Sequence, residues 1–172
     1  MKTAILLILL ALGSVWLFTG GSPRTTSETW GVICRKHWGD LKNADGTTFR
    51  PSAKPYTFVY FSAGWCGPCH QYTPLLVKFY QEAGEQRDFA VVFVSSDRSP
   101  EDMADYMKEM DMPWASAVHG SAGANALKAA YGERGIPHVV LLDAGGAVIA
   151  RSFEGGQYRG PNHPVEVYKS RH

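Results

Sequence analysis

The sequence predicts one α/β domain behind an N-terminal leader, with a mainly parallel central sheet, flanking helices and a closing antiparallel hairpin. Segments rich in β-branched and aromatic residues alternate with segments of helical periodicity. Such alternation is typical of parallel strands joined by crossover helices. The 172 residues are 45% apolar and 19% charged and contain no internal repeat, a composition that favours a single globular core.

The charge and cysteine content exclude several classes of protein. The formal net charge is +1, so no overall field favours binding to nucleic acid or to an acidic surface. The three cysteines, Cys34, Cys66 and Cys69, are too few for a small domain held together by disulfides. Their odd number leaves one thiol without an obvious partner. Cys34 is interpreted as a buried or partly buried spare thiol, with intermolecular pairing or a redox role as the alternatives.

Residues 1–21 have the pattern of an export signal. Lys2 precedes an apolar run over residues 4–18, and small residues follow. As a helix this run would extend about 22 Å, less than the roughly 30 Å of a hydrocarbon core. A cleaved signal peptide is therefore expected, with an uncleaved anchor in the cytoplasmic membrane as the main alternative and a buried core helix as the third. Either of the first two places the protein outside the cytoplasm, periplasmic or secreted, with residues 22–37 as a tether and 38–172 as the domain.

The first half of the domain contains a hairpin, a buried strand and a helix. Asp45-Gly46 is a strong turn signal and predicts a short hairpin over residues 40–49. Residues 56–61 have the composition and length of a buried strand. The apolar spacing after Cys69 predicts a helix that fades near Gly84, and Pro74 inside it is expected to produce a kink.

The second half continues the alternation. A second buried strand is predicted over 89–94, and Ser99-Pro100 followed by two acids predicts the start of a helix that ends near Met110. Further elements are a helix over 125–131, strands over 138–142 and 147–153 joined by Gly145-Gly146, and a short tail in which 164–170 can form only a short helix.

The chemistry is expected at Cys66 and Cys69, which follow the first buried strand and begin a helix. Two cysteines at this spacing bring their sulfurs within bonding distance. The helix N-terminus favours a thiolate through its partial positive charge and free N–H groups. Lowering a cysteine pKa from ~8.5 to ~7 requires about 2 kcal/mol and makes roughly half of the thiol reactive at neutral pH. Cys66, at the exposed start of the helix, is the expected attacking thiolate, and Cys69 is expected to resolve the mixed disulfide.

The pair lies in the stretch Phe61-Ser62-Ala63-Gly64-Trp65-Cys66-Gly67-Pro68-Cys69, which is followed by Thr73-Pro74 and Phe79-Tyr80. Further along come a strand end over 92–97 and the sequence Gly-Ile-Pro-His at 135–138. With these motifs, residues 39–153 resemble the nucleoredoxin and tryparedoxin-like branch of the thioredoxin superfamily.

The resemblance implies a thioredoxin-like thiol–disulfide oxidoreductase that acts on protein or peptide disulfides without a cofactor or metal. Pro137 would be cis, lie against the redox pair and keep metals off the thiols. Ile136 would offer its backbone to an extended substrate, and Trp65 would give the pair an apolar wall. The Gly67-Pro68 pair matches that of reducing thioredoxins, so a reductant supplied by a membrane-linked electron donor is expected.

Two features depart from the family pattern. Many thioredoxins carry a buried aspartate six residues before the first cysteine, where this chain has Tyr60. A tyrosine is a far weaker base at neutral pH, so no general base is assigned to Cys69. The final helix of the family is at most a stub over 164–170.

Three alternatives for the cysteine pair stay open. The first is a static structural disulfide, against which stands the lability of most strained disulfides. Cys66-x-x-Cys69-His70 also matches the pattern for covalent c-type haem, which would make the protein an exported electron-transfer module. Cys34 and His37 together with the pair would supply the four ligands of a structural zinc site.

Other residues are interpreted structurally. His119 is expected in a loop, and Asp97, Glu101 and Asp102 are interpreted as a loop end and a helix cap rather than as a catalytic carboxylate pair. The methionines near Trp114 are interpreted as core residues, with an apolar partner surface as the alternative; they are Met103, Met107, Met110 and Met112.

Overall fold

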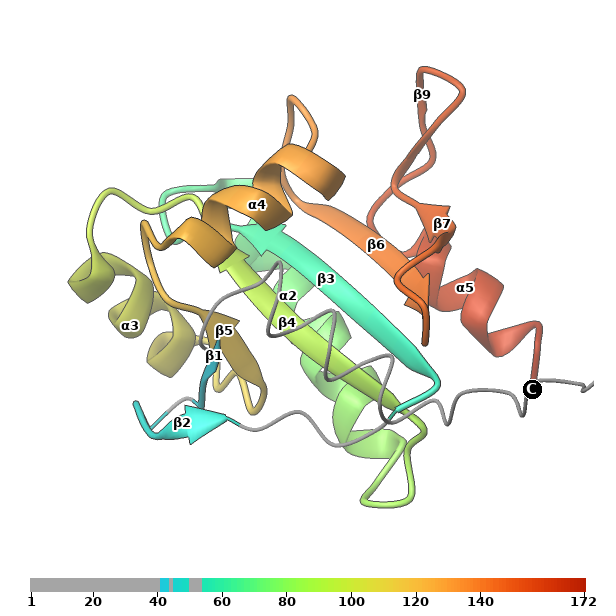
Figure 1. The fold of residues 1–172 in the computed structure, drawn as a ribbon, viewed down its shortest axis with the longest axis horizontal. Coiled ribbons are helices and arrows are strands. Elements are labelled where there is room, and N and C mark those ends of the chain that lie inside the picture. Colours follow the sequence, from blue (N-terminus) through green and yellow to red (C-terminus); the bar gives the residue numbers. More distant parts are fainter. Residues whose placement is uncertain (1–40, 44, 50–53) are drawn as a thin grey trace, which may run out of the picture.

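The computed structural model describes residues 41–43, 45–49 and 54–172. The predicted leader, the tether and Cys34 lie outside these residues. The described part forms a mixed central sheet with helices on both faces, which confirms the predicted fold class (Figure 1). None of the helices in this part is long and apolar enough to cross a membrane.

The main sheet has the strand order β2-β1-β5-β4-β3-β6-β7, and β8 and β9 form a separate two-stranded ribbon. The strands are β1 (Leu41–Lys42), β2 (Thr48–Phe49), β3 (Tyr56–Ser62), β4 (Phe89–Ser95), β5 (Ala115–Ala117), β6 (His138–Asp143), β7 (Val148–Arg151), β8 (Phe153–Glu154) and β9 (Gln157–Tyr158). The helices are α2 (Gly67–Glu82), α3 (Pro100–Glu109), α4 (Ala122–Tyr131) and α5 (His163–Lys169).

The central strands β3 and β4 are buried on both faces, which explains their continuous apolar sequences. Phe58 and Tyr60 on β3 pack in a core shared with α2, α3 and α5. Val59 and Phe61, which alternate with them, pack in a second core with α4. Figure 1 shows α4 in front of the sheet and α2 behind it.

Strand directions bring three connections to one edge of the sheet. β3, β4 and β5 are parallel, whereas β6 runs antiparallel to β3. The segment after β3, the segment after β4 and the loop before β6 therefore lie side by side. Ser62 pairs with Ser95, and Phe61 pairs with His138. This edge carries the cysteine pair.

The helices mostly begin as the sequence predicts. Ser99 caps α3 by accepting a hydrogen bond from the backbone N–H of Asp102. α4 begins at Ala122, before the expected residue 125, because the Ser121 hydroxyl accepts from the N–H of Ala124. Pro74 lies inside α2, and the helix continues through it to Glu82.

Two elements were not predicted. β5 is only three residues long, and its Ala-Ser-Ala sequence lacks the β-branched residues that mark a strand. The β8–β9 ribbon follows β7, where the sequence had suggested one strand over 147–153. The tail forms the short helix α5, as expected, and Val165 on this helix is buried in the main core.

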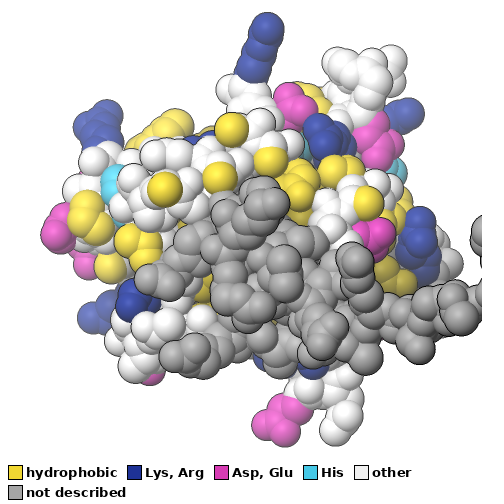
Figure 2. All heavy atoms as spheres, viewed as in Figure 1, with side chains coloured by type: hydrophobic (Ala, Val, Ile, Leu, Met, Phe, Trp, Pro, Cys, Tyr) yellow, Lys and Arg dark blue, Asp and Glu magenta, His cyan; other side chains and the backbone are white. Residues whose placement is uncertain are grey.

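The visible surface carries charges of both signs. On the face drawn in Figure 2, Lys and Arg side chains alternate with Asp and Glu side chains around the rim, without a large region of one sign. This distribution agrees with the formal net charge of +1.

Candidate active site

The cysteine pair stands at the N-terminus of α2. Cys66 is the cap residue in an extended conformation, and Gly67 and Pro68 form the start of the first turn. Proline fits here because the first N–H groups of a helix have no partner within it. The backbone N–H groups of Cys69 and His70 both point to the carbonyl of Cys66. The helix start therefore places both sulfurs where its partial positive charge is strongest.

Cys66 and Cys69 form a disulfide with their Cα atoms 5.2 Å apart. Cys69 is completely buried, and Cys66 is 5% exposed. Cys66 is thus the more accessible of the two, as the sequence predicts. However, the expectation that it lies exposed is wrong: Cys66 is almost entirely buried, and the loop before β6 contacts its sulfur.

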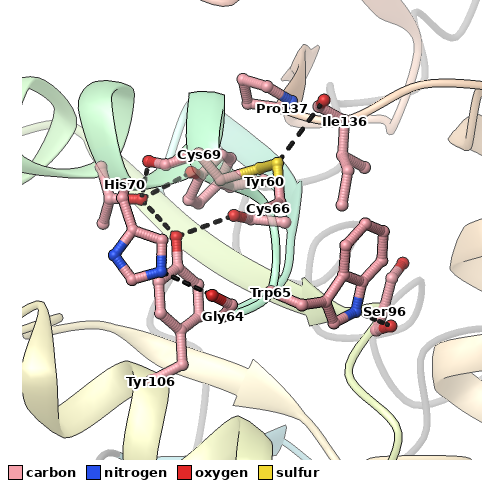
Figure 3. Close-up of a disulfide and its surroundings, with 12 residues drawn as sticks. Tyr60, Gly64, Trp65, Cys66, Cys69, His70, Ser96, Tyr106, Ile136 and Pro137 are labelled. Atoms are coloured by element: carbon pink, nitrogen blue, oxygen red, sulfur yellow. Dashed lines mark hydrogen bonds between the residues drawn. A yellow bond between two sulfur atoms is a disulfide. The ribbon is translucent and has the colours of Figure 1, made fainter.

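That loop contains the cis peptide bond between Ile136 and Pro137. The carbonyl oxygen of Ile136 lies 3.7 Å from the Sγ atom of Cys66 (Figure 3). The structure therefore brings Ile136 and Pro137 next to the redox pair, although about 70 residues separate them along the sequence. Tyr158 reaches the same loop from β9, and its hydroxyl donates to the carbonyl of Pro137 at 3.4 Å.

Gly64, just before the pair, is held on both sides of its backbone. Its N–H donates to the Asp97 carboxylate at 2.7 Å, and its carbonyl lies 2.5 Å from Nε2 of His70. Asp97 is itself buried and accepts a hydrogen bond from the Ser95 hydroxyl. Sequence analysis interpreted Asp97 only as a loop end. Its role in fixing the active-site loop has no sequence signal beyond its place after β4.

Trp65 forms an exposed apolar surface beside the pair. Its side chain is 60% exposed, and its indole N–H donates to the Ser96 carbonyl at 3.1 Å. The hydrogen bond fixes the ring over the end of β4, as Figure 3 shows.

A chain of buried hydroxyl groups lies beneath Cys69. The Thr73 hydroxyl donates to the Cys69 carbonyl at 2.8 Å, so it must accept from the hydroxyls of Tyr60 and Tyr106, each 2.7 Å away. Because the Tyr106 hydroxyl donates its proton to Thr73, it accepts a hydrogen bond from the Ser62 hydroxyl, 3.0 Å away. All four members of this chain, Ser62, Tyr60, Thr73 and Tyr106, contribute a hydroxyl group. Tyr106 was not singled out from the sequence.

The chain explains how a tyrosine is accommodated where many thioredoxins have an aspartate. Burial, followed by the proximity of Tyr106, raises the pKa of Tyr60 well above its usual value of 10.0. Tyr60 therefore stays protonated at neutral pH and is not a base for Cys69. Its hydroxyl instead donates a hydrogen bond to the Thr73 hydroxyl.

Comparison with known proteins agrees with this geometry. A family model described as thioredoxin-like matches residues 55–148, a range that contains the cysteine pair and the cis proline. The chain belongs to the thioredoxin-like family.

Two relatives belong to the nucleoredoxin and tryparedoxin-like branch of the family. The chain is 43% identical to nucleoredoxin of Danio rerio over 98 residues, which are 56% of this chain and 23% of that protein. It is 36% identical to tryparedoxin of Trypanosoma brucei brucei over 94 residues, 54% of this chain and 64% of the relative. The chain thus spans less than a quarter of the nucleoredoxin. Nucleoredoxins and tryparedoxins are thiol–disulfide oxidoreductases.

Solved thioredoxin-like structures share the fold. Thioredoxin from Wuchereria bancrofti superposes with a TM-score of 0.62 at 36% identity, covering 77% of this chain and 95% of that one. Tryparedoxin I from Leishmania major gives 0.59 at 29% identity, covering 66% and 79%. Tryparedoxin II in complex with glutathionylspermidine gives 0.61 at 25% identity, covering 83% and 93%.

The donor atoms of Cys69 and His70 do not fit the haem alternative, whereas the zinc alternative also involves residues outside the described part of the chain. Nε2 of His70, which would have to ligate iron, contacts the Gly64 carbonyl, and Cys69 is fully buried. A zinc site would need Cys34 and His37, which lie outside the described residues, and thiolates where Cys66 and Cys69 form a disulfide. Within the described ranges, no three His, Cys, Asp or Glu residues form a metal-binding group.

The remaining interpretations concern residues outside the site. Glu101 and Asp102 lie in the first turn of α3, as predicted. His119 lies in a loop, where Nε2 contacts the Asp97 carbonyl at 3.0 Å. The methionines are mostly core residues, as the sequence indicates: Met103, Met107 and Met112 are buried, and Met110 is partly buried against the same core.

Proposed function

We propose that the protein reduces protein or peptide disulfides through Cys66 and Cys69. The observation that carries this proposal is the disulfide at the N-terminus of α2, in contact with the carbonyl of Ile136. A disulfide and a dithiol are the two states between which such a pair cycles. Membership of a family that includes thiol–disulfide oxidoreductases supports the same conclusion.

The proposed cycle begins with the reduced pair. The Cys66 thiolate attacks one sulfur of a substrate disulfide, so a Cys66–substrate bond forms, the substrate bond breaks, and the leaving sulfur takes up a proton. Cys69 then loses its proton and attacks Cys66. The mixed disulfide breaks, the Cys66–Cys69 bond forms, and the second substrate thiol leaves. Two electrons and two protons have passed to the substrate, and an external thiol or dithiol donor must restore the pair.

The helix start and the neighbouring loop have separate roles in this cycle. The positive end of α2 favours Cys66 as a thiolate, which is the nucleophilic form. The backbone of Ile136 is available to align an extended substrate beside Cys66, and Pro137 keeps this backbone in place. Trp65 offers its exposed ring to apolar parts of the substrate. Gly67 and Pro68, which match reducing thioredoxins, support the direction as reductant.

We further propose that the protein works outside the cytoplasm, either free or held by its leader at the membrane, and receives electrons from a membrane-linked donor. The support is the Lys2 and apolar pattern of residues 1–21 alone. N-terminal sequencing of the mature protein tests this proposal. A mature chain that begins near residue 22 supports a cleaved signal, and a cytoplasmic chain that retains Met1 contradicts export.

A trapping experiment tests the catalytic assignment. In a Cys34→Ser background, Cys69→Ser removes the resolving thiol, so reaction with a disulfide-linked peptide should leave one peptide covalently attached to Cys66. Intact mass spectrometry measures the adduct, and dithiothreitol should release it. The matched control is Cys66→Ser, in which the buried Cys69 should trap far less peptide. Equal trapping by both variants, or none by either, contradicts the assigned roles.

Turnover separates an enzyme from a binding module. With dithiothreitol as donor, the wild-type chain should accelerate reduction of insulin disulfides, measured by precipitation of the released chains. The Cys66→Ser variant should give only the rate of the thiol alone. A wild-type rate equal to that background contradicts the proposed activity.

A further inference from the structure

A cavity of about 350 Å³ lies beside the redox pair, between the end of β4, the C-terminal end of α4 and the loop that precedes β6. Its walls include Ser96, Lys128, Arg134 and Ile136. We call it the basic cavity. It was not anticipated from the sequence, because its residues come from the end of β3, the segment after β4, and α4 with the loop that follows it.

The basic cavity adjoins the proposed path of the substrate. Ile136, one of its walls, also places its carbonyl 3.7 Å from Sγ of Cys66. Ser96, another wall, accepts the hydrogen bond that fixes the indole of Trp65. A peptide that passes between Trp65 and Ile136 therefore has the cavity directly beside it.

The cavity has a surplus of positive charge. Lys128 and Arg134 are exposed, and neither forms an ion pair or side-chain hydrogen bond within the described ranges. The acid in the lining, Glu133, has its carboxylate 3.5 Å from Arg151 and is neutralised there. Lys128 also faces the negative end of α4, which offsets part of its charge. Arg134 lies beyond the end of α4, and its planar guanidinium group can bind a carboxylate through two parallel N–H groups.

The opposite side of Trp65 has the reverse charge. A cavity of about 320 Å³ there includes Asp102, Asp105 and Glu109 in its lining, with Arg98 as its basic member. A negatively charged group of a substrate is repelled from that side and attracted to the basic cavity. The two cavities thus favour binding of a substrate with its acidic group on the side of the basic cavity.

We propose that the basic cavity is a subsite for a carboxylate of the substrate, supplied by an acidic side chain next to the cysteine of a disulfide-bonded peptide. This inference rests on the proposed disulfide reduction and adds a preference among its substrates. The peptide source is favoured because Ile136 offers backbone groups to an extended chain.

Single-turnover kinetics test the subsite. The full chain carrying Cys34→Ser is reduced, freed of reductant and mixed with one of two disulfide-linked peptide dimers. In the first dimer the cysteine has glutamate on both sides, and in the second it has glutamine. The second-order rate constant at low salt should be roughly three- to tenfold higher for the glutamate peptide, the range expected for two exposed ion pairs. At 0.5 M salt the two rates should approach each other, because exposed charges are screened.

Charge-removing variants identify the cations responsible. Lys128→Met and Arg134→Met should each lower the preference for glutamate, and together they should abolish it while the rate for the glutamine peptide stays unchanged. Lys108→Met is the matched control, because Lys108 carries the same charge on α3 and does not line the basic cavity. This control should keep the full preference.

The outcomes separate the subsite from the underlying function. Equal rates for the two peptides, or a preference that survives the double variant, contradict the subsite alone. Failure to reduce either peptide contradicts the proposed function itself. Glutathione disulfide tests whether the carboxylates of a small disulfide also bind in the basic cavity. If the double variant reduces glutathione disulfide more slowly as well, the cavity accepts carboxylates from both sources. If only the reduction of the glutamate peptide slows, the cavity is a site for peptide side chains.

Discussion

Gly64 is tightly constrained because Asp97 and His70 hold its two backbone polar groups while Tyr106 packs against its Cα atom. A Cβ atom added at Gly64 would lie 3.1 Å from the Cβ of Tyr106 and 3.5 Å from the Asp97 carboxylate. Tyr106 is buried in the core and also belongs to the hydroxyl chain. The side chain that would have to move is therefore one that supports Cys69 indirectly.

We expect Gly64→Ala to lower the free energy of unfolding of the oxidised protein by about 1–3 kcal/mol, as overpacking of a core does. Urea denaturation measures the change. Gly67→Ala is the control, because a Cβ at Gly67 meets no atom within 4 Å and alanine is a better helix former. Gly67→Ala should leave stability unchanged or raise it. Equal destabilisation by both variants would show that the Tyr106 contact is unimportant.

Two buried threonines allow a second comparison at the residue scale. The Thr73 hydroxyl makes three hydrogen bonds, whereas the buried Thr57 hydroxyl has no partner among the described residues. Thr73→Val should cost about 2 kcal/mol, because it leaves the buried Tyr60 hydroxyl without a partner and removes one of the two partners of the Tyr106 hydroxyl. Thr57→Val should instead stabilise by about 1 kcal/mol, since it removes an unsatisfied polar group. Chemical denaturation of both variants measures the difference, and a loss of stability in both would contradict the hydroxyl chain.

Among the elements, α5 contributes more to the core than its length suggests. Val165 is 2% exposed, and the ring of Tyr168 contacts the rings of Phe58, Phe79 and Phe89. The Tyr168 hydroxyl also donates to the Asp88 carboxylate at 2.6 Å. This short helix therefore closes the face of the sheet at which α2 packs.

Val165→Ala should lower the free energy of unfolding by about 2 kcal/mol, from the two methyl groups lost and the cavity left behind. Val148→Ala on the edge strand β7 is the control. Val148 is 40% exposed, so its change should be well under 1 kcal/mol. Thermal unfolding of the two variants under one condition measures both, and equal shifts in Tm would contradict a structural role for α5.

The elements differ in how well the sequence predicts them. β3 and β4 are buried on both faces and are therefore apolar throughout, so their composition identifies them. β5 depends on pairing with strands far away in the sequence, which its own three residues do not encode. β8 and β9 pair with each other, but each is only two residues long and too short to show an alternating pattern.

The same distinction applies to the candidate site. The cysteine pair and Ile136-Pro137 have a local motif. By contrast, Asp97, Tyr106 and the basic cavity owe their positions to connections that the sheet brings together. Contacts between segments far apart in the chain leave no periodic pattern in a single sequence.

At the scale of the whole molecule, His138 makes stability depend on pH. Its side chain is buried against Phe61, and burial lowers its pKa below the usual 6.5, although a hydrogen bond to the Tyr131 carbonyl opposes the shift. Unfolding exposes a ring that binds protons more readily. The contribution of the neutral ring to stability is therefore complete above about pH 6.5 and falls as the pH drops from there towards the folded-state pKa.

We expect the free energy of unfolding to decrease below pH 6.5, with a His138 contribution of at most about 1.4 kcal/mol per pH unit. His138→Gln should reduce this slope while keeping a donor for the Tyr131 carbonyl. Urea denaturation between pH 7.5 and 5.5 measures both proteins. The other histidines are unchanged in the variant, so parallel pH profiles would rule out His138 as the source.

The chain of hydroxyl groups under Cys69 also decides where the proton of Cys69 goes during the proposed cycle. Each of their hydrogens is already directed at a neighbouring oxygen, and burial raises the pKa of the Tyr60 hydroxyl above its usual value. The hydrogen that leaves the second sulfur must therefore be taken up by solvent. Small basic buffer molecules should therefore accept this proton and speed the step. A rate that rises with their concentration would show that the protein has no internal proton acceptor for Cys69.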